Sequence, residues 1–99
     1  MRQLLFTNEV TLEDERVMKL DYSLTEGRTD NDSKVPYYGI QITKYLDNDT
    51  EMDEITGISS CKEDVVLILR KLCQFQVTPI SMVEIVDELM NELVVTGVA

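Results

Sequence analysis

Residues 60–75 of this chain read SCKEDVVLILRKLCQF, and this stretch determines the fold prediction. At about 100° per residue, its apolar side chains share one arc of about 120°, as in a helix that buries one face. They are Cys61, Val65, Ile68, Leu69, Leu72 and Phe75, with Val66 and Cys73 at the margins. Ser60 and Glu63 have the spacing of a capping box, so a helix is predicted over about residues 61–75. Leu67 projects from the polar side and is a candidate contact residue.

The sequence before this helix alternates between apolar and polar residues, which is typical of strands that bury one face. The first stretch, at about residues 3–12, places on one side Leu4, Phe6, Val10 and Leu12. The second, at about residues 17–24, does the same with Met18, Leu20, Tyr22 and Leu24. The acidic turn between them is short, so an antiparallel hairpin is predicted.

Two further strands are predicted before the helix. A polar loop at about residues 25–35 precedes a strand at about 36–46, and a turn then leads to a strand at about 51–58, with a bulge at Gly57. Tyr37 and Tyr45 share the face of the third strand that lies opposite Ile40 and Ile42. They form a candidate recognition surface, and packing across strands is the simpler interpretation.

A second helix is predicted over about residues 82–94. Ser81 and Glu84 form another capping box, with Ile80 and Ile85 spaced as a hydrophobic staple. An alternative start uses Thr78 as the cap and Pro79 as the first helical residue. The apolar arc spans about 180°, which is wider than a surface helix needs. This helix should therefore contact the sheet and also the first helix or a second subunit.

The opposite side of the second helix is acidic. Glu84, Glu88 and Glu92 form a ladder at four-residue spacing with Asp87 beside it, and neither Lys nor Arg occurs after Lys71. Like charges at this spacing cost only about 0.2–0.5 kcal/mol per pair, so a solvated face is the simplest interpretation and a binding surface is the alternative.

The order of strands followed by helices predicts an α+β fold: a four-stranded, mostly antiparallel sheet with two C-terminal helices on one face. A chain of 99 residues has room for one domain, spanning residues 1–99. Its net charge is −10, from 9 Lys and Arg against 19 Asp and Glu. Direct nucleic-acid binding and anionic membranes are disfavoured by this charge. No targeting segment or membrane span is visible, so a cytoplasmic location is predicted.

The sequence offers little chemistry for catalysis or for a cofactor. The absence of His removes imidazole-based triads and zinc sites, and the four glycines are too scattered for a phosphate loop. Cys61 and Cys73 lie about 18 Å apart on the predicted helix, which is too far for a disulfide, and we expect reduced thiols that fill the buried side. The acidic run after Asp47 lacks the glycine and closing glutamate of a calcium loop. We therefore expect no catalytic residue, metal site or cofactor site.

These observations favour a non-enzymatic interaction or regulatory module. One form of it self-associates through the last helix and its tail, at Val94, Val95 and Val98. The competing hypotheses are a small enzyme that uses carboxylates or Cys61, and an acidic nucleic-acid mimic that binds a basic protein through Glu84, Glu88 and Glu92.

Two short motifs carry a resemblance to a known family. The segments Tyr37-Tyr38-Gly39-Ile40 and Val77-Thr78-Pro79-Ile80, the second before an acidic helix, resemble a family of small bacterial proteins that is defined only as a domain of unknown function. The resemblance implies strands followed by helices and a bacterial cytosolic setting. It implies no activity, and Ser81 stands where the family pattern often has His.

Overall fold

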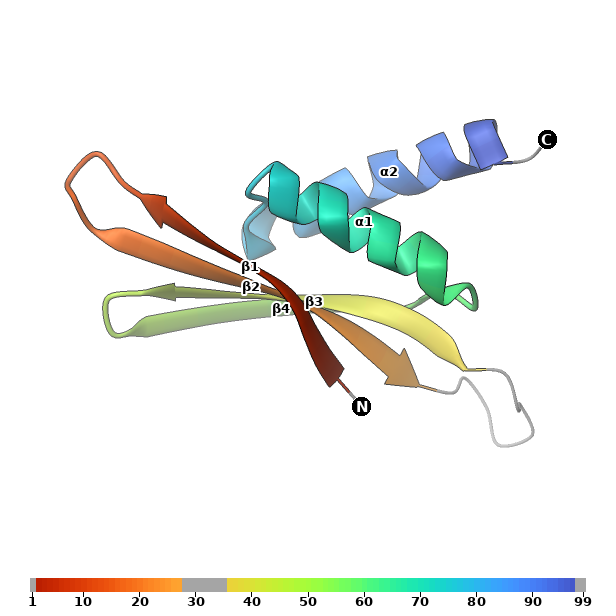
Figure 1. Cartoon of the computed structure of the whole chain (residues 1–99), viewed down its shortest axis with the longest axis horizontal. Helices are drawn as coiled ribbons and strands as arrows, with labels where there is room; N and C mark the ends of the chain where they lie inside the picture. The colour runs from red at the N-terminus through yellow and green to blue at the C-terminus, as the bar shows by residue number, and fades with distance from the viewer. Residues whose placement is uncertain (1, 28–35, 98–99) are drawn as a thin grey trace.

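The computed structural model describes residues 2–27 and 36–97, with the side chains of the last helix described as far as Asn91. The strands are β1 (Arg2–Thr11), β2 (Val17–Gly27), β3 (Tyr37–Leu46) and β4 (Asp49–Ser59). They form one antiparallel sheet in the order β1-β2-β3-β4, so β1 and β4 are its edges (Figure 1). The helices are α1 (Lys62–Gln74), the 3-10 turn η1 (Pro79–Ser81) and α2 (Met82–Gly97). The predicted α+β fold is confirmed.

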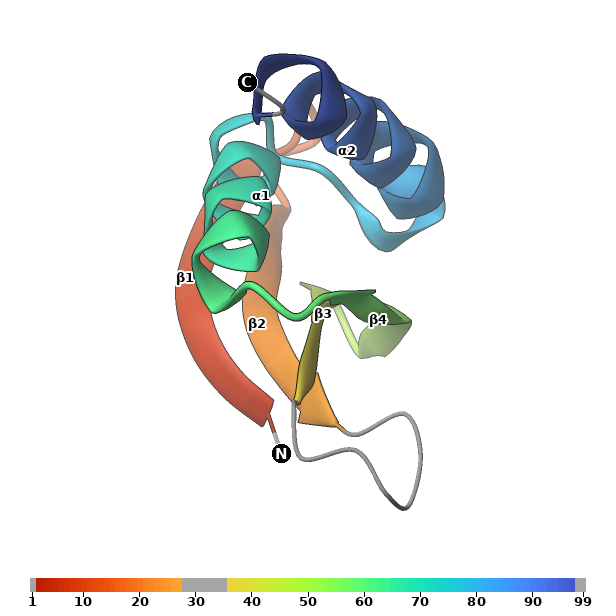
Figure 2. The same ribbon diagram turned by 90° about the vertical axis from the view of Figure 1, so that its right-hand side faces the viewer.

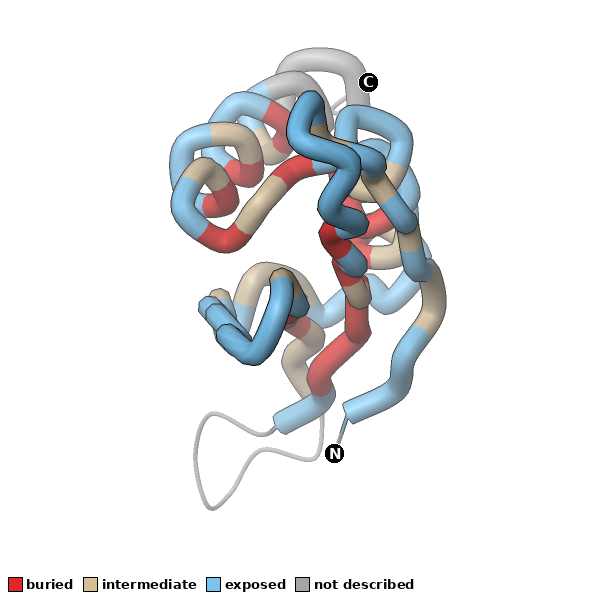
Figure 3. The backbone as a smooth tube through the Cα atoms, turned by 90° about the vertical axis from the view of Figure 1, so that its left-hand side faces the viewer, coloured by how far each residue is buried: buried red, intermediate tan, exposed pale blue. Residues whose placement is uncertain are grey.

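Both helices lie on the same side of the sheet, and α1 contacts all four strands (Figures 1 and 2). The alternation in the second strand holds, because Met18, Leu20, Tyr22 and Leu24 are all buried on this side. Tyr22 lies opposite Phe6 on one side and Ile42 on the other. The core continues into α1 and α2 through the fully or nearly fully buried Val65, Ile68, Leu69, Leu72, Met82 and Val86. Figure 3 shows burial concentrated in the central strands and on the inner sides of the helices.

Both predicted capping boxes are wrong. Helix α1 has Cys61 as its N-cap without a side-chain cap, and the Ser59 hydroxyl instead accepts a hydrogen bond of 3.0 Å from the Cys61 amide. Cys61 and Phe75 were expected on the buried side, but both are exposed. They occupy the two cap positions, where the backbone is no longer helical, so the helical wheel does not apply to them.

The second helix begins at Met82, as predicted, and the alternative start describes the 3-10 turn that precedes it. Thr78 is the N-cap residue of η1, Pro79 is its first residue, and η1 runs directly into α2. The 3-10 turn directs Ile80 into solvent, where 90% of its surface is exposed, and the predicted staple with Ile85 is therefore wrong.

A bulge in β1 changes which residues face the core. The pairing with β2 shifts between Leu4 and Phe6, so that Leu4 lies opposite Ser23 while Phe6 lies opposite Tyr22. Leu4 is therefore on the open face of the sheet, away from the helices, and Leu5 packs against the core instead. The expected common face of Leu4 and Phe6 is wrong, because one inserted residue reverses the alternation.

The predicted bulge at Gly57 is present. Gly57 has a φ of +65°, and residues 56–58 of β4 lie opposite the single residue Gly39 of β3. The loop expected at about 25–35 begins later, because Thr25, Glu26 and Gly27 continue β2 and pair with Gly39, Tyr38 and Tyr37. Residues 28–35 of that loop lie outside the described residues.

Candidate interaction surface

One side of α2 and η1 combines exposed apolar and acidic side chains. It consists of Ile80, Val83, Glu84, Asp87 and Glu88, and we call it the α2 outer surface. Ile80 is 90% exposed and Val83 is 52% exposed. Residues three, four and seven positions apart share one face of a helix, which brings these five side chains together. The opposite side of α2 holds Met82, Val86 and Leu89 in the core. Because the opposite side of α2 packs into the core, the α2 outer surface faces solvent.

The charge of this surface is uniformly negative. Glu84 and Glu88 are four residues apart, Asp87 lies between them, and the sequence contains no Lys or Arg after Lys71. The predicted candidates Glu84 and Glu88 are both exposed. The side chains of Glu92, Val94 and Val95 lie outside the described residues, so their predicted roles stay predictions. A positive partner would relieve the repulsion among the described acids.

Most of the described residues in the wide apolar arc of α2 pack against the core of the same chain. Met82, Val86 and Leu89 are buried, and Ile85 and Met90 pack partly against the same core. Helix α2 also contacts α1, which was one of the two expected second surfaces. Among the described side chains, the apolar residue that α2 leaves most exposed is Val83.

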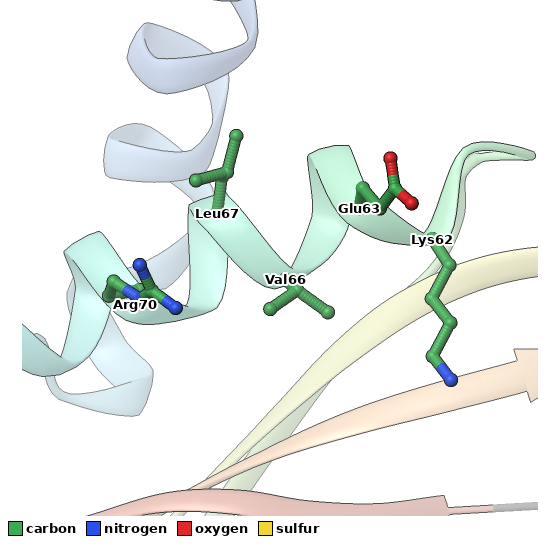
Figure 4. Close-up of a pocket in the computed structure, with 5 residues that line it drawn as sticks. All are labelled: Lys62, Glu63, Val66, Leu67 and Arg70. Atoms are coloured by element: carbon green, nitrogen blue, oxygen red, sulfur yellow. The ribbon is translucent and has the colours of Figure 1, made fainter.

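Leu67 lies beside a shallow groove on α1. Lys62, Glu63, Val66, Leu67 and Arg70 line this groove, which has a volume of about 500 Å³ (Figure 4). Leu67 projects on the side away from Val66, and Lys62 extends toward the strands. The groove contains one carboxylate, two cationic side chains and two apolar residues. The groove is a secondary candidate for an interaction site, because its lining residues do not share one charge or polarity.

Tyr37 and Tyr45 share a face, as predicted, but lie at opposite ends of β3. Eight residues separate them, which corresponds to roughly 27 Å along a strand. Tyr45 lines a depression of about 280 Å³ on the open face, together with Arg2, Leu4, Asp21, Ser23 and Thr43. The Lys19 ammonium lies 5.7 Å from the centre of the Tyr45 ring. The two tyrosines therefore do not form one recognition cluster.

The charged groups of this depression are paired within the chain. Arg2 donates a hydrogen bond of 2.7 Å to the Gln41 side-chain oxygen, and Asp21 accepts one of 2.9 Å from the Thr7 hydroxyl. Lys19 lies 3.9 Å from the same carboxylate. These contacts favour a structural role for the depression.

The two thiols occupy different environments. Cys61 is exposed at the start of α1, so its expected role as a buried filler is wrong. Cys73 is half-buried, and burial raises the pKa of its thiol above the usual value. Within residues 2–27 and 36–91, His, Cys, Asp and Glu side chains form no group of three that could hold a metal ion.

The prediction from sequence missed Ile80 and Val83 as surface residues. Ile80 was assigned to a staple and Val83 to the apolar arc of the helix. The signal for Ile80 was Pro79, because proline favours the first position of a helical turn, and the alternative start at Thr78 is the interpretation that follows from it.

The fold and surface define a small, acidic α+β protein with a four-stranded antiparallel sheet and two helices on one side of it. The chain belongs to the family of unknown function DUF6514, which matches residues 1–92. The resemblance to a family of unknown function is thereby confirmed. No match was found among curated proteins or solved structures, so no relative suggests a function. None of the helices in the described residues combines the length and apolar character needed to cross a bilayer.

Proposed function

We propose that this protein is a non-enzymatic interaction or regulatory module that binds a positively charged protein through the α2 outer surface. The observation that carries the proposal is the exposure of Ile80, 90%, next to Val83 and three carboxylates. A cytoplasmic setting is part of the proposal, and the two free thiols support it.

The apolar pair supplies affinity in this proposal. Burying a Val or Ile side chain fully contributes about 1.5–3 kcal/mol, and only the part now exposed is available for binding. Ile80 therefore contributes more than Val83, which is already about half covered. A pocket on the partner that accepts Ile80 would make it the centre of the contact.

The acids supply specificity for a basic partner. Glu84, Asp87 and Glu88 surround the apolar pair, and the whole chain carries a net charge of −10. The negative electrostatic field of these charges speeds association with a basic surface and repels acidic proteins. It also disfavours pairing of two copies through α2, since both would present the same carboxylates.

Capture of partners from the source cell tests the proposal. The baits are the wild-type protein, an apolar variant with Ile80→Ser and Val83→Ser, and a charge variant with Glu84→Lys and Glu88→Lys. Val17→Ser is the matched control, because Val17 is similarly exposed but lies at the start of β2.

We expect the wild type and the control to retain a protein rich in Lys and Arg, and both α2 variants to lose it. Binding of that purified partner should weaken as salt rises, because screening reduces the attraction. The proposal is wrong if no basic protein is retained, or if the α2 variants retain it as well as the wild type.

A further inference from the structure

The two edges of the sheet differ sharply in charge. Along β4 the exposed residues include Asp49, Glu51, Asp53 and Glu54. The ten residues of β1 contain one cation, Arg2, and one carboxylate, Glu9. An edge strand leaves unpaired backbone N–H and C=O groups, and charge along the edge is a common way to prevent pairing with another copy. β4 has this protection, and β1 lacks it.

The centre of β1 is also apolar. Leu4 is 55% exposed, and Leu5 and Phe6 beside it are only partly covered by the core. In Figure 2 β1 forms one border of the sheet, with α1 over its inner face and no element beyond it among the described residues. A long, neutral and partly apolar edge of this kind is suited to another strand.

The sequence of β1 is complementary to itself. If two copies of β1 run antiparallel about an axis between Leu5 and Phe6, Arg2 lies opposite Glu9 of the second copy, and this contact occurs twice. In the same register Leu4 lies opposite Thr7, and Gln3 lies opposite Asn8.

The bulge makes this register consistent with the two faces of the sheet. Arg2, Leu4, Thr7 and Glu9 pair with Thr25, Ser23, Asp21 and Lys19 on β2, and all of them are on the open face. Gln3 and Asn8 pair with Leu24 and Leu20, whose side chains are on the core face. Without the inserted residue, each pair in this register would join opposite faces. Each copy contributes one bulge at the two-fold axis. The same pairing register therefore holds on both sides of the axis.

We propose that the protein forms a two-fold dimer in which the β1 edges of two copies pair antiparallel and the two sheets become continuous. In the single chain Arg2 reaches across β2 to Gln41 on β3, so on dimer formation its side chain exchanges this hydrogen bond for the Glu9 carboxylate of the second copy. The interface leaves the α2 outer surface free, so the dimer presents two such surfaces to a partner.

Charge exchange across the axis tests the dimer. Molar mass is measured by light scattering over a dilution series for the wild type, Arg2→Glu, Glu9→Arg and the double variant. Each single variant places like charges opposite each other twice, so we expect its dimer to dissociate about tenfold more readily or worse. The double variant restores opposite charges and should return to the wild-type dissociation constant. Glu54→Arg on β4 is the control and should change nothing.

Circular dichroism of each variant establishes that the fold is retained. As a measurement independent of substitution, hydrogen exchange of the wild type should slow at alternate β1 amides as the protein concentration rises. A strict monomer at millimolar concentration, single variants that dimerise like the wild type, or a double variant that stays monomeric would each overturn the proposal. Failure here is distinguishable from failure of the proposed function, because β1 variants should still capture the basic partner.

Discussion

The Tyr22 hydroxyl donates a hydrogen bond of 2.9 Å to the carbonyl oxygen of Val77, fifty-five positions further along the chain. Both residues are buried, so the bond joins the centre of the sheet to the segment between the two helices. The Asn8 side-chain amide makes a related link, donating to the carbonyl of Cys73 at the end of α1. Together these contacts set the position of η1 and α2 above the sheet.

Replacing Tyr22 with Phe should lower the free energy of unfolding by about 1–2 kcal/mol. The substitution keeps the ring but leaves the buried Val77 carbonyl without this donor. Urea unfolding measures the change, and Tyr45→Phe at an exposed position is the control. Equal stabilities for Tyr22→Phe and the wild type would show that the bond contributes nothing.

Alkaline pH should destabilise the protein through the same hydroxyl. Burial raises the pKa of Tyr22 from 10.0 to about 12, although a hydrogen bond with Asn8 acts in the opposite direction. The folded state therefore favours the protonated form. Its stabilisation is complete below the unfolded pKa, about pH 10, and is lost as pH rises toward about 12. Unfolding free energies measured between pH 9 and 12, roughly the range that spans both pKa values, should fall less steeply for Tyr22→Phe than for the wild type.

Replacing Gly39 with Ala should disrupt the pairing of β3 with β4. A Cβ at this position would overlap the Ile55 carbonyl oxygen and lie 2.9 Å from the Thr56 Cα, so the backbone of β4 must move. We expect a loss of about 1–3 kcal/mol in thermal or urea unfolding. Gly27→Ala is the matched control, since nothing lies within 4 Å of the added carbon. Similar effects at the two glycines would contradict the close approach of β4.

Truncation of Leu69 should cost far more stability than truncation of Leu67, two positions away on α1. Leu69 is fully buried, and Leu→Ala in a core costs about 2–5 kcal/mol. Leu67 is 46% exposed and lines the groove, so its replacement should change stability by about 0.5 kcal/mol or less. A large loss at Leu67 would mean that it packs against part of the chain.

The fold could be predicted because its main elements have strong local periodicity. The alternation of Met18, Leu20, Tyr22 and Leu24 identified the central strand, and Val65, Ile68, Leu69 and Leu72 identified the inner face of α1. The errors arose where tertiary structure overrides a local pattern. The bulge at Leu5 moved Leu4 to the open face, and the 3-10 turn moved Ile80 into solvent.

The candidate site was only partly predictable. The acidic face at Glu84 and Glu88 follows from helical spacing, whereas the exposed apolar pair beside it depends on where η1 begins. Tyr37 and Tyr45 were placed correctly on one face by sequence parity, and their spacing of eight positions along the predicted strand already implied that they lie far apart.

Amide NMR shifts of the isotopically labelled protein, with and without the purified basic partner, identify the residues that the partner contacts. We expect the largest changes at Ile80, Val83, Glu84, Asp87 and Glu88, and we expect them to weaken as salt is added. Changes confined to the open face of the sheet or to the α1 groove, with residues 80–88 unchanged, would contradict binding through the α2 outer surface.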